Sequence, residues 1–256
     1  MSAEVAANAA SRPRAPFAPY HPWDRNYFLA VVAIIWIGVV LGFGGDLIRH
    51  FSAPHVAYPL IVHVHAIAFA GWLATLSAQV LLIRAGRQRV HRKLGIAAIG
   101  LAAIMVILGP LTAIAMQRAR LGTPESDPSF LSAQLLSIVA FAALAAAAFA
   151  FRDRSSAHKR LILMATLAIS DAGFARLLGG SVHALFGGGF LASLAGIYLG
   201  SDILIGSLGV YDIVTRRRLH PAYVSAALWL GLIQVTAIAL LRSPAWTAVA
   251  LKLIGH

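Results

Sequence analysis

Seven long apolar segments, separated by short polar stretches, constrain what this chain can fold into. Each is long enough to cross the hydrocarbon core of a bilayer as a helix, which takes about 20 residues. A backbone in lipid must satisfy its hydrogen bonds internally, and continuous apolar runs lack the alternation of a β-barrel strand. We therefore expect an all-α, polytopic transmembrane bundle with seven membrane-spanning helices, approximately at residues 27–48, 58–84, 93–117, 130–151, 160–179, 189–213 and 221–241.

Composition supports a membrane protein and narrows its chemistry. The chain is 59% hydrophobic and only 12% charged, which is typical of an integral membrane protein. It contains no cysteine, so disulfides, iron–sulfur clusters and thioether-linked haem are excluded. The net charge of +12 comes from basic residues between the apolar runs. We expect these residues to contact membrane lipid headgroups, and we expect no nucleic-acid partner.

The distribution of Lys and Arg predicts the orientation. If the N-terminus is cytoplasmic, fifteen of the 21 basic residues fall on the cytoplasmic side. The positive-inside rule then favours an N-in, C-out protein of the bacterial cytoplasmic (inner) membrane. Residues 1–26, rich in Ala and Pro, are expected to form a flexible cytoplasmic tail and not a signal peptide. Residues 27–241 form the transmembrane domain, and residues 242–256 a short C-terminal tail.

Two histidines lie inside the second apolar run. An imidazole at membrane depth is costly unless it is paired, ligated or facing a polar cavity, so His63 and His65 are candidate cofactor or metal ligands. Two residues apart on a helix, they point about 200° apart. His63 shares its face with small residues such as Ala70, so we expect it to face the bundle interior. His65 shares its face with Phe69 and Trp72, which predicts either a lipid face or the wall of a flat apolar pocket.

Carboxylates inside apolar runs form the second group of candidates. Asp202 is expected near the midplane of the sixth span, and Asp171 lies in the fifth. Arg176 is a candidate partner for Asp202, although Asp46 competes for it. Asp171 and Arg176 are about 140° apart around their helix and are not expected to pair. These residues predict either a buried ion pair or a proton or ion path.

Three further histidines lie near span ends. His91-Arg92-Lys93 opens the third span and His158-Lys159-Arg160 opens the fifth, a pattern that lipid headgroup binding also explains. His183 is expected in a glycine-rich loop after the fifth span. Ligation of haem by two histidines needs imidazoles from different segments at similar depth. Candidate pairs are His63 or His65 with His183 on the outer side, and His91 with His158 on the inner side.

The chain resembles uncharacterised bacterial multi-spanning membrane proteins that are classed as a domain of unknown function. The resemblance covers about residues 27–241 and is carried by His65, by His91-Arg92-x-Leu94-Gly95, and by His158-x-Arg160-Leu161 followed by Arg176. More loosely, histidines near the ends of neighbouring spans resemble the cytochrome b561 and ferric-reductase class of haem-binding bundles. That resemblance implies b-type haem and membrane electron transfer.

Three functions follow as hypotheses. The first is a b-type haem or metal-binding protein in membrane electron transfer or oxidase support, with a redox or oxidase protein as partner. The second is a non-catalytic membrane subunit or assembly factor. The third is a proton-coupled transporter that uses Asp202, Asp171 and Arg176. No His-Glu-x-x-His, Gly-x-Ser-x-Gly or phosphate-binding Gly-Lys motif is present, and the sequence leaves open whether the protein is an enzyme.

Overall fold

The computed structural model describes residues 17–52 and 58–255, and every regular element within them is a helix. Seven of these helices are long and apolar enough to cross a membrane, which confirms the expected all-α bundle with seven candidate spans. The elements are α2 (Asp24–Ser52), α3 (Leu60–Arg84), α4 (Gln88–Arg120), η1 (Pro128–Phe130), α5 (Leu131–Ala150), α6 (Ser155–Phe186), α7 (Phe190–Arg216), α8 (Pro221–Leu241) and α9 (Pro244–Leu253).

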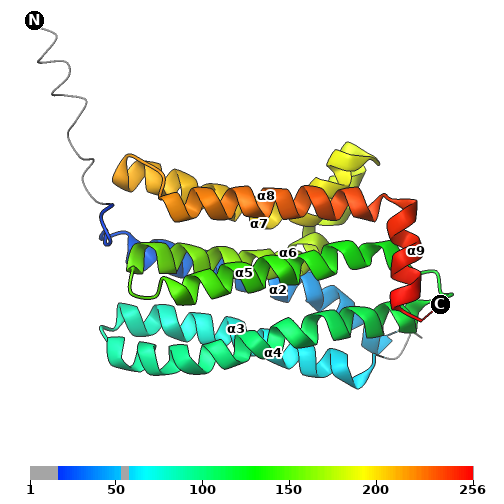
Figure 1. The fold of residues 1–256 in the computed structure, drawn as a ribbon, viewed down its shortest axis with the longest axis horizontal. Helices are drawn as coiled ribbons and strands as arrows, with labels where there is room; N and C mark the ends of the chain where they lie inside the picture. Colours follow the sequence, from blue (N-terminus) through cyan, green and yellow to red (C-terminus); the bar gives the residue numbers. More distant parts are fainter. Residues whose placement is uncertain (1–16, 53–57, 256) are drawn as a thin grey trace, which may run out of the picture.

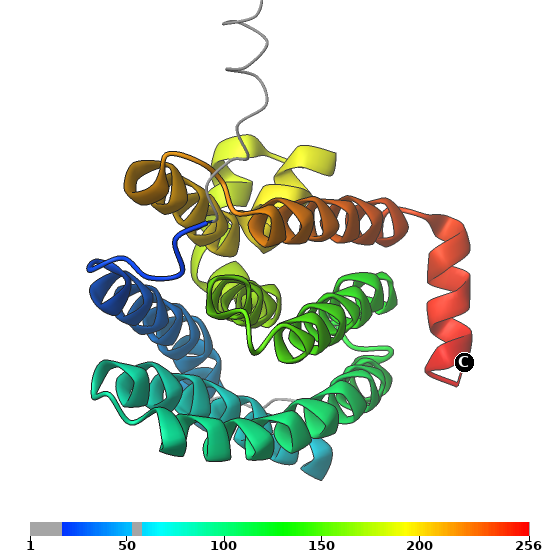
Figure 2. The ribbon, with the colours of Figure 1, turned by 60° about the vertical axis from the view of Figure 1, so that its left-hand side comes forward.

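The long helices lie side by side and alternate in direction (Figure 1). We call the end at which α2, α4, α6 and α8 begin the basic end, because the connections there carry most of the Lys and Arg residues. α9 crosses the opposite end of the bundle, where it packs against η1 and α8 (Figures 1 and 2). Sequential long helices are in contact throughout, as short connections predict.

α6 is the central helix of the bundle. It contacts α2, α5, α7 and α8, and Figure 2 shows it enclosed by its neighbours. It is also the most deeply buried of the seven spans. α3 and α4 form one side of the molecule and α7 and α8 the other (Figure 2). Arg160 and Asp171, two polar residues of α6, are therefore buried inside the protein.

Glycines let α2 and α7 approach α6 closely. A Cβ atom on Gly42 of α2 would collide with the backbone of Gly173 in α6. The ring of Phe174 fills the space that side chains would take at Gly38 of α2 and at Gly200 of α7. Small residues at such crossings allow the van der Waals contact that holds membrane helices together. Phe174 is thus locked between two helices.

Several observed helices extend beyond the expected bounds. The fifth span is longer than residues 160–179 and continues as α6 to Phe186. Residues 244–253, after the seventh span, form α9. Of the expected N-terminal tail, residues 17–23 lie against the basic end, while residues 1–16 are outside the described part of the chain. α4 continues through Pro110 without interruption.

We predict that Gly42→Ala destabilises the protein and that Gly44→Ala does not. The added methyl at position 42 meets backbone, so α2 and α6 must separate, and overpacking of this kind costs about 1–3 kcal/mol. Position 44 is two residues away on the same helix and has open space around it. Thermal unfolding of both variants in mild detergent is the measurement. Equal melting temperatures would show that the α2–α6 contact is not tight.

Candidate functional site

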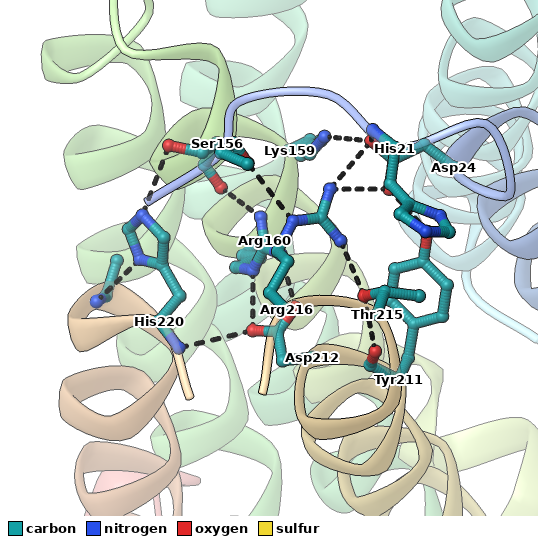
Figure 3. Close-up of polar contacts among 12 residues, drawn as sticks. His21, Asp24, Ser156, Lys159, Arg160, Tyr211, Asp212, Thr215, Arg216 and His220 are labelled. Atoms are coloured by element: carbon teal, nitrogen blue, oxygen red, sulfur yellow. Dashed lines mark hydrogen bonds and ion pairs between the residues drawn. The ribbon is translucent and has the colours of Figure 1, made fainter. Parts of the chain in front are cut away.

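A buried ion pair lies at the basic end, between α6 and α7. Arg160 donates from Nε to Asp212 Oδ2 at 2.8 Å and from Nη2 to Asp212 Oδ1, and both side chains are fully buried. The remaining guanidinium nitrogen, Nη1, donates to the Ser156 carbonyl at 2.7 Å (Figure 3). The backbone N–H of His220 donates to Asp212 Oδ2 at 3.3 Å. The pair is therefore bidentate and further hydrogen-bonded, as a buried pair must be.

A second carboxylate, Asp24 at the start of α2, binds two cations. Lys159 Nζ lies 2.7 Å from its Oδ2, and Arg216 Nη2 lies 2.9 Å from each of its oxygens (Figure 3). The Tyr211 hydroxyl donates to Oδ1 at 2.5 Å. Asp24 thus joins α2, α6 and α7 at one end, in a network whose members are all paired. Such a network fixes the register of three helices.

His220 closes this network from α8. Its Nδ1 accepts the N–H of Ala222, which caps the first turn of α8, so Nε2 carries the proton and donates to the Ser156 hydroxyl at 3.2 Å. Burial, together with the nearby Arg160 guanidinium, lowers the pKa of His220 to about 4. Phe17 packs edge-on against the ring, with centroids 4.5 Å apart. His220 is therefore neutral at physiological pH.

The middle of the bundle holds a second polar cluster. Asp171 is buried in α6 and pairs with the hydroxyl of Ser201 in α7. The same hydroxyl lies 3.0 Å from the Tyr198 carbonyl. Asp202, the next residue of α7, accepts a hydrogen bond of 2.8 Å from Gln234 of α8. Among the described residues, neither carboxyl is in an ion pair.

The close packing of α7 against Phe174 brings the residues of this cluster together. Asp171 lies one turn before Phe174 on the same side of α6, and Ser201 directly follows Gly200. Because the Phe174 ring fits against Gly200, α7 comes close enough for Ser201 to reach Asp171. The Tyr198 hydroxyl, one turn earlier on α7, is buried and has no hydrogen-bond partner in the described part of the chain.

The ion pair of Arg176 differs from one of our expectations. Arg176 binds Asp46 of α2 at 2.6 Å, so the competitor pairs with it and Asp202 does not. Both side chains are partly exposed. Arg176 Nη1 also donates to the carbonyl of Ala172. The pair lies towards the end opposite the basic end and is separate from the cluster around Asp171.

The interior face of α3 is the opposite of the expected one. His63 is exposed, and the buried residues of α3 are Ala68, Trp72, Leu73 and Leu76. His65 is on the inward side, stacked on Phe69 with centroids 4.0 Å apart, and its Nδ1 is buried without a partner in the described residues. Ala66, Ala70 and Ala74, small residues on the face of His63, are exposed as well. The expectation for His63 was wrong because a stripe of small residues permits close packing but does not require it.

The inner pair of histidines is brought together. His91 of α4 and His158 of α6 have ring centroids 6.4 Å apart, with the rings nearly perpendicular. His158 Nδ1 lies 2.8 Å from the Ala148 carbonyl, which can only accept, so Nε2 keeps its lone pair. His91 Nδ1 and Gln79 Oε1 are buried and have no partner among the described residues.

The outer histidines are not arranged as a pair. His183 is not in a loop: it is an exposed residue of α6, and the connection to α7 is residues 187–189. His63 is exposed on α3. Within residues 17–52 and 58–255, no group of three or more His, Asp or Glu side chains could hold a metal ion.

The sequence analysis missed the most extensive polar network. Arg160 was counted as an interfacial cation, and Asp212 and Asp24 were not singled out. Asp212 lay inside the expected sixth span, 189–213, and an acidic residue at that position was a usable signal. Its partner is 52 positions away on another helix, which no local pattern reveals.

We predict that removing one partner of the Arg160–Asp212 pair destabilises the protein more than removing both. Arg160→Met leaves a buried, unpaired carboxylate and should lower the free energy of unfolding by about 3–5 kcal/mol, whereas Arg160→Met/Asp212→Leu should recover most of the loss. Arg176→Gln, in the partly exposed pair, should cost at most about 1 kcal/mol. Thermal unfolding in detergent measures all three. A double variant as unstable as Arg160→Met would contradict this account.

Comparison with known proteins gives no independent lead. The chain matches no protein-family model, no curated protein and no solved structure.

Proposed function

We propose that this protein is a multi-pass protein of the bacterial cytoplasmic membrane that carries protons through its central helices by way of Asp171 and Asp202. The proposal rests on one observation: a buried carboxyl group, Asp171, lies at the middle of the central helix, and no cation pairs with it among the described residues. In this proposal, the basic end of the bundle faces the cytoplasm, as the positive-inside rule predicts.

Depth is the first support. Asp171 is about 23–24 Å from both ends of α6, and Asp202 is about 18–21 Å from the ends of α7. Both positions fall near the centre of a hydrocarbon core about 30 Å thick. A charged carboxylate there is costly, and such residues are rare unless they belong to a substrate, ion or proton path.

Hydrogen bonding is the second support. The Ser201 hydroxyl has one proton but lies within reach of both Asp171 Oδ1 and the Tyr198 carbonyl. If the hydroxyl donates to the carbonyl, a protonated Asp171 satisfies the remaining contact by donating to Ser201. If Asp171 is ionised, the hydroxyl turns to it, and the carbonyl keeps only the backbone N–H of Asp202, its donor within the helix. The cluster thus has two hydrogen-bonded arrangements that differ by one proton.

The neighbouring carboxyl is the third support. Asp202 directly follows Ser201, the hydrogen-bond partner of Asp171, so the two carboxyl-bearing residues lie at similar depth on adjacent helices. Asp202 is partly exposed on the side of the bundle, with Gln234 as its hydrogen-bond donor. A proton held at Asp171 therefore has an acceptor on the adjacent helix.

We predict that Asp171→Asn abolishes proton movement without unfolding the protein. Asn keeps the shape and can hydrogen-bond Ser201 but cannot release a proton, so flux should fall by about a hundredfold. Flux is measured in proteoliposomes with an internal pH-sensitive dye and an imposed potassium diffusion potential. Asp46→Asn, which alters a carboxyl outside the cluster, is the matched control and should keep its flux. Unchanged flux in Asp171→Asn would refute the proposal.

A second candidate function is electron transfer through b-type haem at His91 and His158. The ring centroids of His91 and His158 lie 6.4 Å apart, and two histidines from different helices are the residues that would hold a b-type haem there. The contact between His158 Nδ1 and the Ala148 carbonyl orients that ring as metal-ligating histidines are commonly oriented. The unpartnered Nδ1 of His91 is the other available nitrogen. Bound there, haem would supply one-electron chemistry near the basic end.

The haem candidate predicts a visible chromophore that depends on two histidines. Protein expressed with ample haem should show sharp reduced α and Soret bands, and a pyridine haemochrome assay should give about one haem per chain. His91→Ala and His158→Ala should each remove the bands. His63→Ala and His183→Ala change exposed histidines and should leave them intact. A colourless wild-type protein would eliminate this candidate and leave the proton proposal untouched.

A further inference from the structure

We propose that a groove between α5, α6 and α8 at the basic end binds one anionic phospholipid, with its phosphate at Arg154 and an acyl chain between α5 and α8. The groove has a volume of about 670 Å³. It is separate from the cluster around Asp171, and the proposal does not depend on proton transport.

The walls of the groove suit an acyl chain. They are apolar along α5 and α8, and several of the wall residues are alanines, which leave room between the helices. The wall residues include Ala143, Leu144 and Ala147 of α5, Leu161 of α6, and Ala226 and Trp229 of α8. A phospholipid chain is the apolar molecule that surrounds every membrane protein, so it is the natural occupant of such a space.

The mouth of the groove suits an anion. Arg154 is the only charged residue in the described lining, and no carboxylate lines the groove. His220 also lines the groove and is neutral. The Arg154 guanidinium lies over the Phe151 ring, 5.5 Å from its centroid, and forms no ion pair among the described residues. Asp153 is in the same connection but does not line the groove. An arginine held in this way is available to bind a phosphate with two parallel hydrogen bonds.

Further donors continue from the mouth into the groove along α8. Ser225 lies four residues after Pro221, and Trp229 follows one turn later on the same face. The indole Nε1 of Trp229 is buried, and no hydrogen-bond partner lies in the described part of the chain. An unsatisfied buried donor is costly, and an ester carbonyl of a phospholipid would satisfy it. The order of a charged head, polar esters and apolar chain matches the order of groups in the groove.

The test compares lipids of different charge and two arginines of one connection. Purified, delipidated protein in mild detergent is titrated with phosphatidylglycerol and, separately, with diacylglycerol of the same chains, which lacks the phosphate, and bound lipid is counted by native mass spectrometry. We expect phosphatidylglycerol to bind about tenfold more tightly, which is the size of one charge-assisted contact. Arg154→Gln should remove that preference. Arg152→Gln, which lies two residues away and outside the groove, should keep it.

Two further variants test the groove itself. Ala147→Phe fills the apolar wall and should abolish binding of both lipids, with its melting temperature in detergent as the control for folding. Trp229→Phe keeps the ring but removes the donor and should weaken binding about fivefold. Equal affinity for the two lipids, equal loss in Arg152→Gln and Arg154→Gln, or unchanged binding in a folded Ala147→Phe variant would each overturn the proposal. Arg154 is exposed, so its variant remains decisive if Ala147→Phe does not fold.

Discussion

The close approach of α6 to α2 and α7 is the constraint on which the rest of the structure depends. Lipid tails are as apolar as the helix surfaces, so burial of apolar area does not drive these helices together, and van der Waals contact must hold them. Gly42 meets the backbone of Gly173, and Phe174 fits against Gly38 and Gly200. This contact makes α6 the central helix and carries Asp171, one turn away, to the interior of the bundle.

The two polar clusters of the bundle differ in how their charged groups are paired. At the basic end, Arg160, Asp212 and Asp24 are each bound by opposite charges and further hydrogen-bond partners, so the network needs no ligand or proton to be stable. At the centre, Asp171 and Asp202 have only neutral partners among the described residues. Since membrane helices seldom keep carboxyls in that condition without use, the contrast separates a structural network from a candidate functional one.

The sequence predicted the position of the histidines along the bundle axis better than it predicted which face of a helix they occupy. His91 and His158 were expected at the same end on different spans, and their rings lie 6.4 Å apart. His183 was expected in a loop because glycines surround it, yet α6 continues past it to Phe186. Glycine is frequent in membrane helices, where lipid removes the alternative of hydrating the backbone, so it is a weak signal for a helix end there.

The sequence by itself determined the helical class, the seven spans and most of their bounds, because the length and polarity of a segment decide locally whether it can cross a bilayer. Tertiary structure alone decided which face of each helix is interior and which charges pair. His65 and not His63 faces inward, Asp46 and not Asp202 binds Arg176, and Arg160 meets Asp212 from 52 residues away. A stripe of small residues can pack against several different helices, and a single charged residue can pair with several others. Only the packing of all seven helices decides which of these contacts forms.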